Sequence, residues 1–417
     1  MRRPSFAAMG MTREAVWWRG SWNAAVRGAS AFGWQGADLD ADVLMARAAK
    51  ETGLFDFGDM DFREPLDLLL RDFAAHARAD ATGRQVLAEM LRGALRNRLY
   101  IREALRGHPD IAGAGAVAPL FIVGLPRTGT TLLQGLLAQV RGLRTPLMWE
   151  TTLPSALPAL SPPRVLTRHR KRIENGVRTA NRLSPRLKTA HEFGALLPEE
   201  CNPLQMTSLR GLVNAFMFPC PTYAQSLYAT EFRGAYDWHK LHLQLLSYRQ
   251  PATTWLLKAP AHMASLGELL RVYPDARVVF THRDPLESVA STARLAACLH
   301  ALFSPAIDYA ELGHRINSTM GRLQDAAHAV RDRWPATAPP FLDIRYADLV
   351  GDPVGTVRGI LLHFGIAEPE GTATLWLRYL RRNRQHRFGR HRYGLADFAL
   401  VEADVRRTFA REYALLG

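Results

Sequence analysis

The stretch LFIVGLPRTGTTLLQGLL, residues 120–137, decides the fold class of this chain. It opens with a short apolar run, 120–125, that ends in Gly and Pro, a pattern typical of a strand buried on both faces of a parallel sheet. A helical pattern of apolar residues follows through Leu133, Leu136 and Leu137. A strand that passes through a glycine-containing turn into a helix indicates an α/β domain.

Further strands are predicted on the carboxyl side of this unit. The segments TTWLLKA (253–259), ARVVFTHR (276–283) and FLDIRY (341–346) are apolar runs of strand length. Helical patterns follow two of them, at 264–273 and at 353–364. Because strands alternate with helices, we expect an α/β fold in which a P-loop-like parallel sheet is flanked by helices.

Two other regions differ in character from this alternating part. Apolar residues at helical spacing predict a helical N-terminal extension or cap over 1–115, which ends in the Gly/Pro/Ala-rich segment 107–119, and 116–417 is then the main domain. Within it, 150–250 is rich in Pro and Arg and is predicted to be an insertion that lines the acceptor side together with the cap. Its aromatic residues suit either an acceptor site or core packing: Phe216, Phe218, Tyr223, Tyr228, Tyr236 and Trp238.

The turn between the first strand and its helix, GLPRTGTT (124–131), has the context of an anion-binding loop. Backbone N–H groups and the helix dipole favour a negative charge at such a helix start. In the nucleotide-triphosphatase P-loop a Lys stands where this chain has Thr130, whereas the cation here, Arg127, lies inside the loop. The loop is therefore predicted to bind an anion other than a nucleoside triphosphate.

A second group of polar residues follows the strand that ends at Arg283. Pro285 suits the first position of a helix, and Ser291, eight residues beyond Arg283, lies about two helical turns farther on. Ligands of open α/β sheets bind at the carboxyl ends of the strands. Arg283 and Ser291 are therefore predicted to converge on a second phosphate.

The composition is that of a globular protein with a strong basic excess. The 417 residues carry a formal net charge of +14, and 48 of the 53 basic residues are Arg. Arginine suits phosphate and sulfate, but an Arg-biased composition accounts for the excess equally well. Three widely spaced cysteines and an N-terminus without a long apolar run predict a chain of a reducing, cytoplasmic compartment, with no membrane span.

These motifs together resemble the sulfotransferases that use 3′-phosphoadenosine 5′-phosphosulfate (PAPS), in their bacterial branch, which is related to the tyrosylprotein sulfotransferases. GLPRTGTTLL resembles the family's 5′-phosphosulfate loop, and RDPLESVAS (283–291) resembles its 3′-phosphate site. The likeness covers roughly 119–417 and includes four further segments in the expected order: PEECNPL (198–204), LLKAPAH (256–262), DIRYADLVGDP (343–353) and HRFGRHRYGL (386–395).

The resemblance implies PAPS as co-substrate, adenosine 3′,5′-bisphosphate as product, and no metal. Arg127 would act beside the leaving phosphate, and Lys258 would be a second catalytic cation. The residues implied in binding the nucleotide are Arg127, Thr128, Gly129, Thr130, Thr131, Arg283, Ser291, Tyr346, Arg387, Gly389 and Arg390, with Arg392 in the same C-terminal loop. Because the family's usual RKG triplet reads RFG at 387–389, the Arg of that loop that meets the phosphate stays open.

The catalytic base has several candidates. The tyrosylprotein and heparan enzymes have a Glu a little downstream of the loop helix, and Glu150 falls near that point, about two residues later. The cytosolic enzymes have a His just after the strand-end Lys, a position that His262 approaches with a longer spacing. Glu199 and Glu200 are the third possibility.

The function predicted on this basis is metal-independent, in-line transfer of a sulfuryl group to a hydroxyl, or an amine, of a small-molecule, lipid or glycan acceptor. The enzymatic alternative is a P-loop kinase or nucleotide hydrolase, which the missing Lys disfavours. The net charge also suggests a nucleic-acid-binding protein, although the chain carries no helix-turn-helix, zinc-finger or RNP signature. Nucleic acid is therefore not expected as a partner.

Overall fold

Five parallel strands form the central sheet of the computed structural model, which describes residues 19–26, 37–114, 118–152, 161–187, 192–250, 254–335, 340–383 and 394–416. The strands are β1 (Leu120–Gly124), β2 (Leu143–Arg144), β3 (Thr254–Lys258), β4 (Arg277–His282) and β5 (Phe341–Arg345). Their order across the sheet is β2-β3-β1-β4-β5. The four strands predicted from apolar runs are confirmed, and the two-residue β2 was not predicted.

The register of the strands brings their carboxyl ends to one edge. Gly124 of β1 lies opposite Thr281 of β4, and Ile122 lies opposite Lys258, the last residue of β3. Residues that follow β1, β3 and β4 therefore meet at this edge, where parallel sheets bind their ligands.

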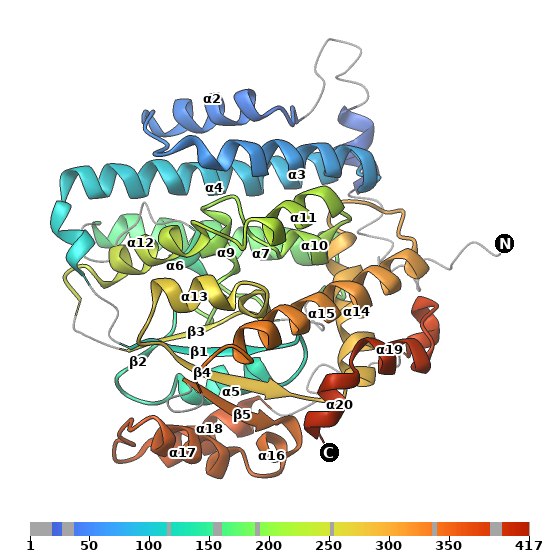
Figure 1. The fold of residues 1–417 in the computed structure, drawn as a ribbon. Coiled ribbons are helices and arrows are strands. Elements are labelled where there is room, and N and C mark those ends of the chain that lie inside the picture. Colours follow the sequence, from blue (N-terminus) through green and yellow to red (C-terminus); the bar gives the residue numbers. More distant parts are fainter. Residues whose placement is uncertain are drawn as a thin grey trace.

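The two faces of the sheet bury different side chains of β1. Leu120 and Ile122 belong to a smaller core on one face, while Phe121 and Val123 belong to the large core on the other. Four helices cover the first face, and the last three of them lie below the sheet in Figure 1. They are α5 (Thr130–Leu137), α16 (Tyr346–Gly351), α17 (Pro353–His363) and α18 (Thr372–Arg382).

The second face carries more helices and the C-terminal segment. These elements are η3 (Pro260–Met263), α13 (Leu266–Val272), α14 (Pro285–His300), α15 (Tyr309–Arg331), η4 (Leu395–Phe398), α19 (Glu402–Thr408) and α20 (Ala410–Leu416). As predicted, Pro285 begins α14, and the Asp284 side chain accepts a hydrogen bond from the N–H of Leu286 at the helix start.

The described residues of 150–250 are largely helical and lie between the sheet and the N-terminal helices (Figure 1). Its helices are α7 (Pro163–Leu183), α9 (Asn202–Met206), α10 (Asn214–Met217), α11 (Pro221–Ala229) and α12 (Ala235–Ser247), and α6 (Met148–Thr152) precedes them. The described residues between β2 and β3 therefore form helices and loops.

The N-terminal helices form the outermost layer in Figure 1. Residues 19–26 are helical, and the elements that follow are α2 (Ala41–Thr52), η1 (Met60–Phe62), α3 (Arg63–His76), α4 (Ala81–Gly107) and η2 (Pro109–Gly113). Asp40 and Asp80 cap α2 and α4 with side-chain hydrogen bonds. Leu66 and Leu91 of this layer share one core with Phe121 of the sheet, so the described part of the extension packs as one body with the main domain.

Candidate active site

The loop 124–131 joins β1 to α5 and requires glycine at two positions. Gly129 has φ = 91° and directly precedes α5. A Cβ atom there would lie 2.9 Å from Cδ2 of Tyr346. A Cβ atom on Gly124 would lie 2.2 Å from the Thr281 hydroxyl. The loop is therefore packed tightly against β4 and α16, with no room for larger residues.

Thr128 stabilises the loop from inside. Its hydroxyl donates a hydrogen bond to the carbonyl of Leu125 over 2.7 Å and lies 2.6 Å from the hydroxyl of Thr281. The Thr128 side chain is buried and is not part of the cavity lining, whereas Thr130 and Thr131 line the cavity. Thr128 thus stabilises the loop, whereas Thr130 and Thr131 are accessible from the cavity.

The two predicted phosphate-binding groups lie next to each other. Nε of Arg127 donates to the Ser291 hydroxyl over 3.0 Å, and the guanidinium of Arg283 donates to the Arg127 carbonyl over 2.8 Å. Arg283 also pairs with Glu287, and its Cζ lies 4.1 Å from the centre of the Tyr346 ring. The structure therefore brings together four of the predicted nucleotide-binding residues, Arg127, Arg283, Ser291 and Tyr346.

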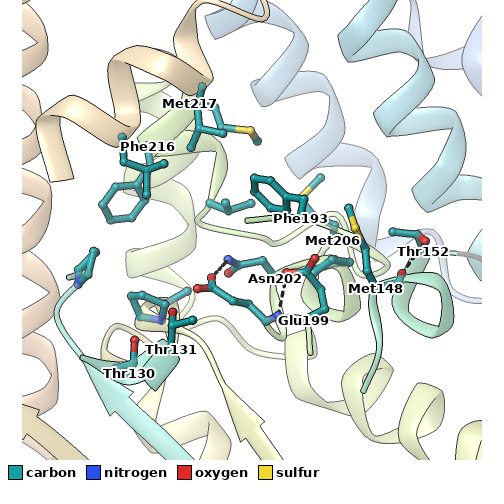
Figure 2. Close-up of a pocket in the computed structure, with 18 of the residues that line it drawn as sticks. Thr130, Thr131, Met148, Thr152, Phe193, Glu199, Asn202, Met206, Phe216 and Met217 are labelled. Carbon is teal, nitrogen blue, oxygen red and sulfur yellow. Dashed lines mark hydrogen bonds between the residues drawn. The ribbon is translucent and has the colours of Figure 1, made fainter. Parts of the chain in front are cut away.

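A cavity of about 920 Å³ begins at this loop. Figure 2 shows Thr130 and Thr131 at one end of the cavity, Glu199 and Asn202 in the middle, and Phe216 and Met217 at the far end. Arg127, Arg283 and Tyr346 also line it. One cavity therefore connects a group of cations and hydroxyls with an apolar chamber.

The apolar chamber is built by three parts of the chain. The insertion supplies Phe193, Met206, Phe216 and Met217, α14 supplies Leu295, Ala296 and Leu299, and α4 supplies Met90, Gly93 and Ala94. The N-terminal helices therefore contribute to the site. Of the six aromatic residues considered from the sequence, only Phe216 is among the lining residues. Phe218, Tyr223 and Tyr236 are fully buried in the core instead.

Lys258 and Glu200 form a partly buried ion pair beside the cavity. The Nζ atom of Lys258 lies 2.6 Å from Oε1 of Glu200, and the amide of Asn202 donates to the other carboxylate oxygen, Oε2, also over 2.6 Å. Glu200 and Asn202 line the cavity, while Lys258 is buried behind them. The Cys201 N–H bonds the Lys258 carbonyl, which fixes the PEEC segment to the end of β3.

Glu199 is a buried carboxyl group that lines the cavity. Burial raises its pKa to about 7, although the N–H of Glu200, which donates to it over 2.8 Å, favours the charged form. A carboxyl group with a pKa near neutrality can accept a proton at physiological pH. Among the described residues that line the cavity, Glu199 has the electrostatics of a general base.

Glu150 is engaged elsewhere. One oxygen of its carboxylate pairs with Arg144 at 3.0 Å, and the other accepts the Leu147 N–H at 2.9 Å. Its side chain is buried and does not line the cavity. This geometry indicates a role in fixing the segment between β2 and α6.

His262 is also buried away from the cavity lining, although its neighbours Pro260 and Ala261 line the cavity. Its Nδ1 atom lies 2.5 Å from the hydroxyl of Tyr236, and its ring packs edge-on against Phe121. Burial lowers the pKa of His262 to about 3, which makes it a weak base. The structure thus brings neither Glu150 nor His262 to the cavity.

The remaining predicted site residues, Arg387, Gly389, Arg390 and Arg392, lie outside the described residues. Within the described ranges, no group of three or more His, Cys, Asp and Glu side chains has the arrangement of a metal site. In the same ranges, no helix has the length and apolar composition needed to cross a membrane.

Comparison with known proteins gives a match to the family model described as "Sulfotransferase family" over residues 119–370. The crystal structure of sulfotransferase STF1 from Mycobacterium tuberculosis superposes with a TM-score of 0.78 and 30% identity, covering 89% of this chain and 98% of that one. Sulfotransferase STF9 from Mycobacterium avium has a similar fold, with a TM-score of 0.76 at 24% identity over 91% of this chain and 97% of that one.

Two curated relatives are also similar over a shorter stretch. Both are named omega-hydroxy-beta-dihydromenaquinone-9 sulfotransferase Stf3, one from Mycobacterium bovis and one from Mycobacterium tuberculosis. Each is 28% identical over 158 residues, which is 37% of this chain. The matched stretch spans about 40% of the length of these relatives.

Proposed function

The chain belongs to the sulfotransferase family, and from this premise we propose that it transfers the sulfuryl group of PAPS to a hydroxyl group on an apolar acceptor. The observation that carries the proposal is the single cavity that connects the cations and hydroxyls of the loop with an apolar chamber. The donor fits the first part and the acceptor fits the second.

The residues at the loop suit a nucleotide that carries phosphates at the 3′ and 5′ positions of its ribose. Gly129, Thr130 and Thr131 would hold the 5′-phosphate with backbone and hydroxyl donors at the start of α5. Arg283 and Ser291 would hold the 3′-phosphate, with charge-assisted hydrogen bonds from the guanidinium. Tyr346, whose ring already lies against Arg283, would contact the adenine. By resemblance, the segment with Arg387, Gly389 and Arg390 would complete this end.

When bound, PAPS supplies an activated sulfuryl group whose bond to the 5′-phosphate oxygen breaks as a bond to the acceptor oxygen forms. Arg127 would stabilise the negative charge that develops on the phosphate oxygen. The resident cations supply this charge stabilisation, so we propose that no metal is needed. Lys258 would hold Glu200 in place at the cavity wall and add positive charge near the reacting group.

The proton of the acceptor hydroxyl must pass to a base. We assign this role to Glu199, because it lines the cavity and because its pKa of about 7 suits proton transfer near neutral pH. Glu150 and His262 suit the role less well, because neither lines the cavity. Both carboxylate oxygens of Glu150 accept hydrogen bonds from other groups, and burial lowers the pKa of His262 to about 3.

The acceptor class follows from the apolar chamber. Met, Phe, Leu and Ala side chains offer few hydrogen-bonding groups to a sugar but can enclose hydrocarbon. The similar Stf3 proteins are named for an omega-hydroxy-dihydromenaquinone, a name that specifies a hydroxyl group. A hydroxylated lipid is therefore the acceptor that we propose.

Three free, buried cysteines support a reducing, cytoplasmic compartment.

Calorimetric titration of adenosine 3′,5′-bisphosphate and of 5′-AMP tests the donor site. Arg283→Ala should weaken binding of the bisphosphate about 10- to 150-fold, the worth of a charge-assisted hydrogen bond, and leave 5′-AMP binding nearly unchanged. Arg358→Ala is the matched control, because Arg358 is an exposed residue of α17 paired with Glu368. Equal affinity of the wild type for both nucleotides would overturn the 3′-phosphate assignment.

Turnover is tested with PAPS labelled in its sulfuryl group and a lipid extract as the acceptor source. Label should pass to a lipid-soluble product, and Arg127→Ala should abolish the transfer. Absence of labelled product from the lipid fraction, together with label in a water-soluble glycan, would exclude the apolar acceptor while leaving sulfuryl transfer in place.

A further inference from the structure

Helix α7 (Pro163–Leu183) carries a row of cations along one side. The row has five members, spaced by four, three, seven and four residues, and all five are exposed: Arg164, Arg168, Lys171, Arg178 and Arg182. Because an α-helix turns once every 3.6 residues, these steps keep the side chains on one face over a length of about 27 Å. The uncharged Asn175 occupies the one gap in the spacing.

The opposite side of α7 is apolar and fixes the direction in which the row points. Leu166 and Ile173 pack against Trp149 and Ala195 in a small separate core, and Val177 is buried. The helix is thus anchored through its apolar face, and the row of cations faces solvent. We call this row the α7 basic stripe.

Several exposed arginines on other helices have acidic partners: Arg106–Glu103, Arg358–Glu368, Arg406–Glu402, Arg407–Asp404 and Arg411–Asp332. Within the ranges that the structure describes, none of the five stripe cations forms a salt bridge. The single acid of α7, Glu174, instead accepts the backbone N–H of Ala195 over 2.7 Å. An Arg-biased composition explains many arginines but not this concentration of uncompensated charge.

The same helix forms part of the cavity wall. Arg172, Ile173, Gly176 and Val177 line the cavity, next to the apolar chamber. A molecule that fills such a chamber is poorly soluble in water and resides in a bilayer. A surface that brings α7 to a bilayer would therefore bring the cavity close to the source of its acceptor.

We propose that the α7 basic stripe docks the protein on the surface of an anionic lipid bilayer. A straight row of exposed cations is complementary to a flat sheet of anionic headgroups, to which each Lys or Arg adds attraction within a Debye length. The apolar face of α7 is buried in the protein, so the contact is electrostatic and peripheral. The choice of a bilayer over a nucleic acid rests on the apolar chamber, and so on the acceptor of the proposed function. Binding itself requires no turnover.

Vesicle flotation of the full chain tests the proposal. The wild type should bind vesicles of phosphatidylcholine with phosphatidylglycerol and should not bind phosphatidylcholine alone, and binding should weaken as salt increases. The triple variant Arg168→Gln, Lys171→Gln, Arg178→Gln should reduce binding by about tenfold or more. None of these three residues lines the cavity, so the affinity for adenosine 3′,5′-bisphosphate should not change, which also shows that the variant is folded.

The matched control removes the same charge elsewhere. The variant Arg358→Gln, Arg406→Gln, Arg407→Gln neutralises three exposed arginines on α17 and α19 and should keep vesicle binding within about twofold. Equal loss in the two variants would assign binding to net charge and overturn the proposal. Loss of duplex DNA binding in the stripe variant, with vesicle binding intact, would assign the stripe to nucleic acid and also overturn it. Vesicle binding without any sulfuryl transfer would uphold docking while refuting the proposed function.

Discussion

The imidazole of His282 and the carboxylate of Glu412 form a buried pair that ties the end of β4 to the C-terminal helix α20. Nδ1 of His282 lies 2.9 Å from Oε1 of Glu412, and Nε2 lies 2.7 Å from Oδ1 of Asp343 on β5. The next residue of α20, Tyr413, donates its hydroxyl to Asp284 over 2.8 Å. Helix α20 therefore holds the residues on both sides of Arg283.

Glu412→Gln should destabilise the protein by about 1–3 kcal/mol, because it removes a charged partner of a buried hydrogen bond. Burial opposes the charge on His282, but the hydrogen bonds to Asp343 and Glu412 prevail and raise its pKa to about 9. The stability gained from a raised pKa is complete below the unfolded-state value near 6.5 and is lost as pH rises through about 9. Urea unfolding should therefore show the largest difference from wild type near pH 6 and a smaller one above pH 9.

The exposed ion pair on the same helix provides the control for this prediction. Arg411 pairs with Asp332 at the surface, so Asp332→Asn should change the free energy of unfolding far less than Glu412→Gln does. A loss in Glu412→Gln that is equal at pH 6 and above pH 9 would show that the charge on His282 contributes nothing.

The stacking of Arg283 on Tyr346 predicts a graded effect on nucleotide affinity. Tyr346→Ala should weaken the binding of adenosine 3′,5′-bisphosphate about 2- to 30-fold, because it removes a cation–π contact that orients the guanidinium. Tyr346→Phe keeps the ring and should retain affinity within about twofold. Calorimetric titration measures both, and equal losses in the two variants would assign the effect to the hydroxyl instead of the ring.

Glu199 predicts a specific dependence of activity on pH. If it is the base, kcat/KM should rise as pH increases through about 7, where its carboxyl group loses its proton. Glu199→Gln should reduce kcat by about 100-fold or more and leave nucleotide affinity unchanged. A pH profile of the residual activity that keeps the same inflection would assign the base to another residue.

The same substitution should stabilise the fold at alkaline pH. A carboxyl group whose pKa is raised by burial favours the folded state while it is protonated, and this stability is lost as pH rises from about 4.5 through about 7. Glu199→Gln cannot ionise, so its melting temperature should exceed that of the wild type at pH 8. Glu150→Gln serves as the comparison: it breaks the pair with Arg144 and should lower the melting temperature.

The strands and the loop of this protein could be predicted from sequence because their signals are local. The apolar runs that became β1, β3, β4 and β5 need only a few residues to be recognised, and the loop is marked by its glycines. Arg127 and Arg283 could each be placed at the carboxyl edge of the sheet, because each lies at the end of a predicted parallel strand.

The choice of base could not be predicted, because it depends on where a side chain points. Glu150 and Glu199 are both carboxylates and both were candidates for the base. In the structure Glu150 pairs with Arg144, whereas Glu199 lines the cavity. The contact between α20 and the end of β4 could not be predicted from sequence either, because 130 residues separate His282 from Glu412 along the chain.

Lys258 and Glu200 should show strong coupling in a double-mutant cycle. Lys258→Met leaves the Glu200 carboxylate without its ion-pair partner beside the cavity and should cost about 3–5 kcal/mol of stability, because a partly buried charge is then uncompensated. Adding Glu200→Gln removes that charge and should restore about 1–3 kcal/mol of the loss, which is the smallest coupling free energy expected for the pair. Sulfuryl transfer should stay abolished in the double variant, because the cation is still missing. Urea unfolding and turnover are measured on the wild type, the two single variants and the double variant. Fully additive losses of stability would show that Lys258 and Glu200 do not interact. Turnover that recovers in the double variant would show that Lys258 has no role in catalysis.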